Sequence, residues 1–252
     1  MRKLLTNPIA TGLASLILNA TNVKAQGPYE PDLYTKALYH LNETEGTNVT
    51  DATGINHGSA FGEYEWVNGI FSNSIRLINA DVQIPHRNQL NLDDQITLEA
   101  WVFPDTLLSA HSNNIIRKEL GSGIGEQYLL RINESYQLDF VFALRNGFWG
   151  RISQYYQFQN RQWYHVAGTY DGLNHKLWVN RQLIAHQIFP SDPLRHSNQG
   201  YMFIGHSLND DKFYGKIDEV RVSSIARDFS TTSTPDTDPR ISTWGKIKSL
   251  FK

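Results

Sequence analysis

The feature that most constrains this fold is a series of short runs of strand-forming residues. Gly, Asn and Asp separate these runs, and no long stretch with helical periodicity joins them. Within Ile96–Phe103, Leu98, Ala100 and Val102 share one face, as the two-residue period of a strand requires, and Trp101 lies on the other. Apolar side chains on both faces are typical of a strand in the middle of a sandwich with a covered face. The chain is therefore predicted to be all-β, with ten strands in two packed antiparallel sheets. The strands are expected at Ala37–Leu41, Ser74–Ile78, Ile96–Phe103, Ile115–Lys118, Tyr128–Ile132, Gln137–Ala143, Tyr164–Tyr170, Lys176–Asn180, Tyr201–Gly205 and Gly215–Ser223.

The first 25 residues have the pattern of a secretory signal peptide. Arg2 and Lys3 precede the mostly apolar segment Ile9–Leu18, and Val23–Ala25 offers the small-x-small pattern that a signal peptidase reads. A membrane anchor is one alternative, but an apolar run of about ten residues is well short of the roughly 20 needed to span a bilayer. A short buried helix is the other. We expect residues 1–25 to be removed and the protein to be secreted, extracellular or periplasmic.

The charge and the absence of cysteine exclude several classes of function. Removal of residues 1–25 would take away Arg2, Lys3 and Lys24 but no acid, so the formal charge would move from −2, for 23 basic and 25 acidic residues, to −5, for 20 and 25. The body of the chain has no basic patch of the kind that neutralises phosphates, so no nucleic-acid partner is expected. With no cysteine there is no disulfide, no thiolate metal site and no cysteine nucleophile.

Several motifs occur in the order and spacing of a known family. The main ones are Leu90–Val102, Trp163–Gly172 and Gly215–Val222, and shorter matches precede them at Leu41–Glu43, Asp51–Gly54 and Trp66–Phe71. Together they resemble the laminin G-like jelly-roll domain of the concanavalin A-like superfamily. The resemblance covers residues 37–229, after a lead-in at 26–36, and implies a two-sheet antiparallel jelly-roll sandwich. This architecture carries lectins, glycosidases and adhesion domains, so it does not fix an activity.

The resemblance also implies a structural calcium ion. Many sandwiches of this kind hold one where an acid on the last long strand meets the N-terminal segment, and Asp218 matches that acid by motif. Calcium takes six to eight oxygen ligands, and Glu43 could bring another from the opposite end of the sequence. Asp218 and Glu43 are therefore the predicted metal ligands. The alternative is that Asp218 and Glu219 pair with Arg221 or Arg76 as charges on the sheet surface.

Catalysis is not expected, because the carboxylate pairs of the related glucanases are missing. Retaining hydrolysis needs two carboxyl groups about 5 to 5.5 Å apart, which alternate positions on one strand can supply. Glu99 and Asp139 each stand alone on their predicted strands. Asp218 and Glu219 are adjacent, hence on opposite faces. Acids from separate strands could still converge, so a glycoside hydrolase is kept as the less favoured alternative, and His165 is expected to be packed or hydrogen-bonded rather than catalytic.

An aromatic region with interleaved arginines, residues 148–163, is the best candidate for a binding site. Aromatic rings stack on the apolar side of a sugar while guanidiniums and amides bind hydroxyls. Turns are expected at Asn146-Gly147 and Ser153-Gln154, which would expose the side chains near them. The alternative is that strand alternation sends half of these rings into the core. The predicted ligand-binding residues are Trp149, Arg151, Tyr155 and Tyr156.

The C-terminal segment, residues 230–252, differs from the body of the chain. Ser230–Pro239 has the composition of a linker, and Ile241–Lys252 places apolar residues every three positions with lysines between them. Such a basic amphipathic tail could make weak contact with a membrane surface, although 12 residues are marginal for an isolated helix and a frayed tail is the alternative.

Taken together, these features predict an exported, non-catalytic binding module that recognises a carbohydrate or glycoconjugate. A protein-interaction or adhesion domain that uses the same loops is the alternative. The expected partner is a glycan or an extracellular protein.

Overall fold

The computed structural model describes residues 27–108, 111–121, 125–189, 192–197, 199–206 and 211–230. In these residues fourteen strands and one short 3-10 helix form an antiparallel β-sandwich, which confirms the predicted fold class. The elements are β1 (Thr35–Tyr39), β2 (Asn48–Val49), β3 (Gly58–Asn68), β4 (Asn73–Ile84), η1 (Asn88–Leu90), β5 (Ile96–Pro104), β6 (Asn113–Glu119), β7 (Glu126–Ile132), β8 (Gln137–Ala143), β9 (Trp149–Tyr155), β10 (Tyr164–Tyr170), β11 (Asn174–Val179), β12 (Gln182–Ile188), β13 (Met202–Ile204) and β14 (Gly215–Ser223).

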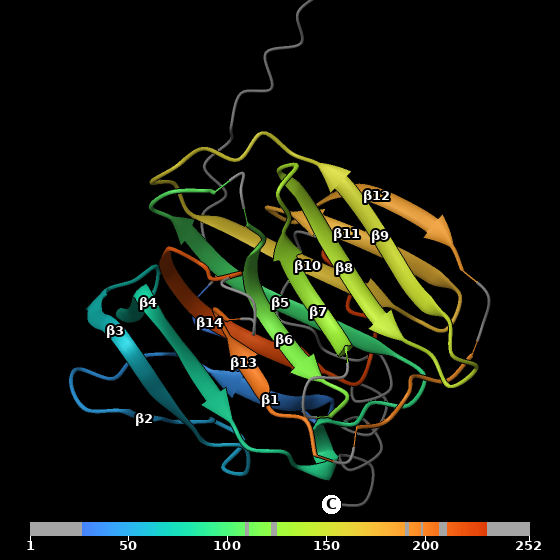
Figure 1. Ribbon diagram of the computed structural model, residues 1–252, viewed down its shortest axis with the longest axis horizontal. Coiled ribbons are helices and arrows are strands. Elements are labelled where there is room, and N and C mark those ends of the chain that lie inside the picture. The colour runs from blue at the N-terminus through green and yellow to red at the C-terminus, as the bar shows by residue number, and fades with distance from the viewer. Residues whose placement is uncertain are drawn as a thin grey trace, which may run out of the picture.

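The strands form two layers that face each other across the core. The front layer has the order β13-β6-β7-β8-β9, and the back layer has the order β12-β11-β10-β5-β14, with β1 added at β14. Figure 1 shows β6 to β9 crossing in front of β5, β10 and β11. Where β12 meets β9, Nε2 of Gln187 donates to the carbonyl oxygen of Arg151 at 2.9 Å, so the two layers are also joined at this edge.

Strand β4 connects the two layers. Residues 75–77 of β4 pair with β14 in the back layer, whereas residues 82–84 pair with β13 in the front layer. Between these two stretches the register with β3 shifts at Glu63 and Tyr64, and such a β-bulge bends a strand and increases its twist. One continuous sheet therefore folds over on itself to make the sandwich.

Alternate residues of each strand fill the interior. In β5 the inward residues include Ile96, Leu98 and Val102, which are all fully buried, as the two-residue period predicts. Burial of a side chain of this size stabilises a fold by about 1.5–3 kcal/mol. Gly168 of β10 allows the layers to approach closely, because a Cβ atom there would lie 2.3 Å from Cγ of Phe140.

All ten predicted strands are present, and four others were not predicted. Strand β4 extends to Ile84 rather than Ile78. The unpredicted strands are β2, β3, β9 and β12, and β9 matters most because it carries the predicted binding residues. The turn expected at Ser153-Gln154 is wrong, since both residues lie inside β9, where pairing with β8 overrides their turn preference. The turn expected at Asn146-Gly147 is confirmed.

Two predicted segments lie outside the described residues and stay predictions. They are the signal peptide and the linker and tail from residue 231 onward. Among the residues that are described, none belongs to a helix long and apolar enough to cross a membrane.

Candidate functional site

The outer face of β9 carries three of the four predicted ligand-binding residues. Alternation along the strand turns Gly150 and Ile152 toward the core and leaves Trp149, Arg151 and Tyr155 on the outer face of the front layer. Trp149 is 42% exposed and Tyr155 is 57% exposed. Because the two residues are six positions apart in the strand, their rings stand about 20 Å apart along it. The face therefore has an aromatic ring at each end and a guanidinium between them.

A buried carboxylate fixes Arg151 in the middle of this face. Asp139 of β8 is fully buried and accepts hydrogen bonds of 2.9 and 3.0 Å from Nε and Nη2 of Arg151. Nε of Arg131 donates to the same carboxylate at 2.9 Å, and so does the hydroxyl of Ser153. Arg131, Asp139 and Ser153 are cross-strand partners, so the register of β7, β8 and β9 assembles the cluster. Two guanidiniums share one carboxylate, which leaves one net positive charge.

Two small residues give the Trp149 ring its room. Ala143 lies opposite Trp149 in β8, and a Cβ atom on Gly125 would lie 3.0 Å from Cη2 of the indole. The ring therefore reaches across β8 toward the start of β7. Gly147 in the turn before β9 has a φ angle of 89°, a conformation that favours glycine, and this turn sets the position of Trp149.

Tyr156, the fourth predicted ligand-binding residue, does not belong to this face. It follows the last residue of β9, and the centre of its ring lies 4.9 Å from that of Phe158 and 6.0 Å from that of Tyr164. These rings pack against the core, and burial raises the pKa of Tyr156. Tyr156 therefore fits the alternative expectation, that strand alternation turns some of these aromatic side chains toward the core.

Two carboxylates from separate strands converge on the same outer face. Glu119 of β6 and Glu126 of β7 are cross-strand partners. Nη1 of Arg117 lies 2.9 Å from Oε1 of Glu119, and Nε of Arg117 lies 3.5 Å from Oε1 of Glu126. Both acids are therefore engaged by one buried guanidinium, and together the three side chains carry one net negative charge.

Asp218, a predicted metal ligand, lies on the outer face of the back layer. Its Oδ2 accepts hydrogen bonds from the backbone amides of Ile70 (2.8 Å) and Phe71 (3.2 Å), whereas its buried Oδ1 has no partner. Burial raises the pKa of Asp218 to about 7, although these two amides favour the charged form. A buried carboxylate with one free oxygen fits the role of a cation ligand.

Glu43, the other predicted metal ligand, also has one engaged and one free oxygen. Its Oε1 accepts a hydrogen bond from the amide of Thr50 at 2.8 Å, and its buried Oε2 has no partner. The turn from β3 into β4 links the two acids: Nδ2 of Asn73, the first residue of β4, donates to the carbonyl oxygen of Glu43, and Gly69 lies against Asp218. No group of three or more His, Cys, Asp or Glu side chains suited to a metal occurs in the part of the chain described, so calcium here would need backbone and amide oxygens as well.

The expectation that Asp218 and Glu219 lie on opposite faces is wrong. The register of β14 with β5 shifts between Asp218 and Arg221, and Glu219 at this bulge has a φ angle of 50°. A bulge re-aims side chains. Glu219 accordingly turns to the outer face, where it accepts a hydrogen bond from the amide of Tyr29 at 2.9 Å and lies 2.8 Å from Nδ1 of His40.

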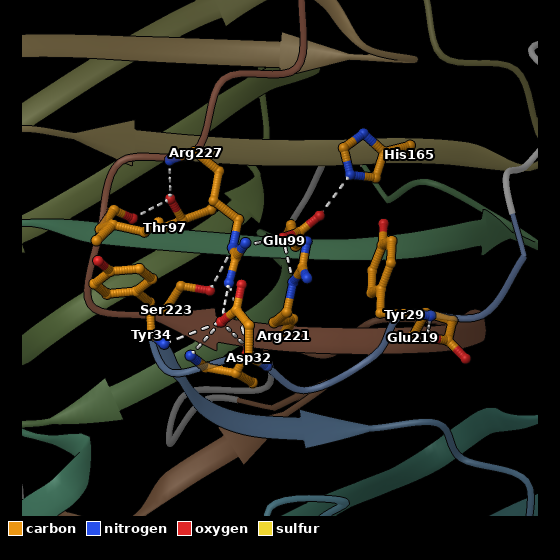
Figure 2. A network of polar contacts seen from close by, with 12 residues as sticks. Tyr29, Asp32, Tyr34, Thr97, Glu99, His165, Glu219, Arg221, Ser223 and Arg227 are labelled. Carbon is orange, nitrogen blue, oxygen red and sulfur yellow. Dashed lines mark hydrogen bonds and ion pairs between the residues drawn. The ribbon is translucent and has the colours of Figure 1, made fainter. Parts of the chain in front are cut away.

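The back face also contains a buried charge network that the sequence did not predict (Figure 2). Glu99 of β5 is fully buried, accepts a 2.7 Å hydrogen bond from Nε of Arg221 and lies 3.1 Å from Nε2 of His165. Although burial opposes it, the guanidinium of Arg221 and the His165 ring hold the pKa of Glu99 well below its usual range. Nη2 of Arg227 lies 2.8 Å from Oδ1 of Asp32, so both terminal segments are tied to this face.

The contacts of this network bear on two expectations from the sequence, for His165 and for the pairing of Asp218 and Glu219. His165 is buried and hydrogen-bonded, as predicted. The surface pairing considered for Asp218 and Glu219 is wrong, because Arg221 binds Glu99 and Arg76 binds other acids, Glu65 and Asp105.

Comparison with protein families gives a match over residues 78–230, more than half of the chain, to the concanavalin A-like lectin/glucanases superfamily. The chain belongs to this family. The resemblance seen in the sequence motifs is thus confirmed. A search among curated proteins found no match.

Solved structures similar to this concanavalin A-like domain include an enzyme-associated module and toxin domains. Domain 4 of AbnA, a GH43 extracellular arabinanase from Geobacillus stearothermophilus, in complex with arabinotriose, has a TM-score of 0.61 and 19% identity over 78% of this chain and 95% of that one. The binding domain of botulinum neurotoxin serotype G has a TM-score of 0.60 and 12% identity over 85% of this chain and 51% of that one. At these identities the likeness concerns the fold alone, and this chain spans about half the length of the neurotoxin domains.

In this concanavalin A-like domain, the missed site residues are Asp139, Arg131, Glu99 and Arg227. The sequence contained a signal for Asp139, since it is the one acid in an otherwise apolar stretch of β8. Its partners could not be found from the sequence without the register of three strands.

Proposed function

We propose that this concanavalin A-like domain is an exported, non-catalytic binding module that recognises a carbohydrate through the outer face of β8 and β9. The observation that carries the proposal is the order of exposed groups along β9: a ring at Trp149, a fixed guanidinium at Arg151 and a ring at Tyr155. Rings stack on the apolar side of sugars, and a guanidinium held by Asp139 can donate to hydroxyls without losing its own freedom on binding.

Two similar structures support a carbohydrate ligand. Domain 4 of AbnA is in complex with arabinotriose, and cell entry of botulinum neurotoxin type C depends on interaction with two ganglioside molecules. The binding domain of botulinum neurotoxin DC, in complex with rat synaptotagmin II, supports the alternative, which is a protein-interaction domain. The open aromatic face favours the glycan.

A glycan array that contains arabinotriose and ganglioside headgroups tests the proposal. We expect the purified protein to bind one class of glycan, and Trp149→Ala to lower that affinity about 10- to 100-fold, because stacking on an aromatic ring and its burial are lost. Phe61→Ala is the matched control, since Phe61 is 51% exposed but lies on β3, six strands away across the sheet. If the protein binds no glycan on the array and captures an extracellular protein, the alternative is established. Hydrolysis of a bound glycan would overturn the non-catalytic assignment.

We also propose that Asp218 and Glu43 contribute to a structural calcium site on the back face. Each presents one buried carboxylate oxygen without a hydrogen-bond partner. Neither acid makes an ion pair within the described part of the chain, so an ion there would supply a positive charge and would hold the loop before β4 against the N-terminal segment.

A further inference from the structure

Gln127 of β7 is an exception among the buried polar side chains. It is fully buried, yet neither the oxygen nor the nitrogen of its amide has a hydrogen-bond partner. Buried polar groups are nearly always hydrogen-bonded, because an amide that leaves water without a new partner loses the whole of its hydration. This side chain therefore requires an explanation.

Gln127 belongs to the front face and not to the core. Its neighbour Tyr128 and the next inward residue, Leu130, are part of the core cluster, so alternation places Gln127 on the opposite side of the strand. Lys118 of β6 pairs with Tyr128 of β7, and the next residue of β6, Glu119, pairs with Glu126. Gln127 is therefore the extra residue of a β-bulge. Bulges are common next to binding sites, where they re-aim a side chain.

The Trp149 ring reaches the chain just before Gln127. Tyr128, the residue after Gln127, pairs with Phe142 of β8, and the next residue of β8, Ala143, pairs with Trp149 of β9. From β9 the indole extends over the small Ala143 as far as Gly125, two residues before Gln127. Trp149 is itself 42% exposed, so a ligand at the surface can contact the indole on this side of the face.

We propose that Gln127 is the polar anchor of a sugar subsite beneath Trp149, and that the sugar bound there is neutral. This inference rests on the proposed carbohydrate-binding function. A glutamine amide presents an acceptor oxygen beside a donor nitrogen, which matches two adjacent hydroxyl groups of a sugar ring. Trp149 then stacks on the ring whose hydroxyls Gln127 binds.

The charges at the Gln127 end and in the middle of the face give the preference for a neutral sugar. At the Gln127 end, Glu119 and Glu126 share Arg117 and leave one net negative charge, which repels a sugar carboxylate. Farther along the face, the pairing of Asp139 with two arginines leaves a net positive charge. A glycan with an acidic residue would therefore place it near Arg151 and its neutral end at Trp149.

Gln127→Met tests the subsite, because methionine keeps the length of the side chain and removes the amide. We expect the affinity for neutral oligosaccharides, arabinotriose among them, to fall about tenfold or more. The melting temperature should stay equal or rise, since the free protein loses no hydrogen bond. Gln182→Met, on an exposed glutamine of β12, is the control and should change neither quantity. A clear fall in melting temperature with unchanged affinity would overturn the inference.

The results with these variants distinguish failure of the subsite from failure of the proposed function. If the wild type binds glycans and Trp149→Ala weakens the binding while Gln127→Met binds as the wild type does, the subsite is wrong and the function stands. If the wild type binds no glycan, both fail.

In ¹⁵N-labelled protein, a shift of the Gln127 side-chain amide signals on addition of arabinotriose supports the subsite. Stronger dependence on Gln127 for a sialylated headgroup than for neutral sugars overturns the preference for a neutral one.

Discussion

The outer faces of the two layers contain the same arrangement, a buried acid held by two arginines. On the back face the acid is Glu99, with Arg221 at 2.7 Å and Arg227 at 3.9 Å. On the front face it is Asp139, with Arg131 and Arg151 both at 2.9 Å. The two faces differ in their cover, by which we mean how far the arginine side chains are shielded from solvent. The side chain of Arg227, which ties the two terminal segments together, is 1% exposed, whereas that of Arg151 is 52% exposed.

This difference in cover assigns different roles to similar chemistry. A charge that is buried and paired holds segments in place, because its partner cannot return to water when the pair is broken. An exposed guanidinium keeps water as an alternative partner, so its pairing contributes little to stability but leaves it available to a ligand. The back face is therefore closed by the chain itself, and the front face is where we expect a partner to bind.

Removal of the acid on the back face should give the largest effect. Glu99→Gln leaves Arg221 buried without its counter-charge, while Arg227 keeps Asp32, so we expect the free energy of unfolding to fall by about 3–5 kcal/mol. Urea denaturation at pH 7 measures it. Glycan affinity at temperatures where the variant is folded should be unchanged. An unchanged urea midpoint would mean that the covered network does not hold the terminal segments.

The second effect concerns the pH dependence of Asp218, another buried acid of the back face. Because the folded-state pKa of Asp218, about 7, is higher than its unfolded value, the group's contribution to stability is present at pH 4 and is lost as the pH rises toward 7. For a shift of about three units this amounts to up to about 4 kcal/mol. We expect Asp218→Asn to remove this slope, measured as urea midpoints between pH 4 and 8 in the presence of chelator.

Calcium provides the control for that experiment. A bound cation favours the ionised carboxylate, so excess calcium at pH 7 should raise the melting temperature of the wild type and leave Asp218→Asn unaffected. Equal melting temperatures of the wild type with calcium and with chelator would remove the calcium proposal, while the pH slope measured in chelator would stand.

The same comparison explains how much the sequence could predict. Strands β8, β10 and β14 were predicted with the ends that they have, because their apolar runs are bounded by turn residues. Strand β9 was missed because its polar residues face solvent at the end of a layer, where only pairing with β8 makes it a strand. Trp149, Arg151 and Tyr155 could be proposed from their residue types alone.

The charge clusters could not be predicted, since they depend on register between distant segments. Glu99 and Arg221 are 122 residues apart in the chain, and nothing in either local sequence indicates the other. The bulge that turns Glu219 outward is equally invisible, because alternation is the default expectation for a strand.

The smallest effect on stability is expected where the same acid is removed from the open face. Asp139→Asn leaves Arg131 and Arg151 with access to water, so the free energy of unfolding should fall by no more than about 1 kcal/mol. The guanidinium of Arg151 would lose its fixed orientation, and glycan affinity should fall about 3- to 10-fold, because ordering that side chain is then part of the cost of binding. Urea denaturation and glycan titration of Asp139→Asn and Glu99→Gln, measured side by side, test whether cover distinguishes the two faces. If Asp139→Asn destabilises the fold as strongly as Glu99→Gln does, cover is not the difference, and the front cluster is a structural element like the one on the back.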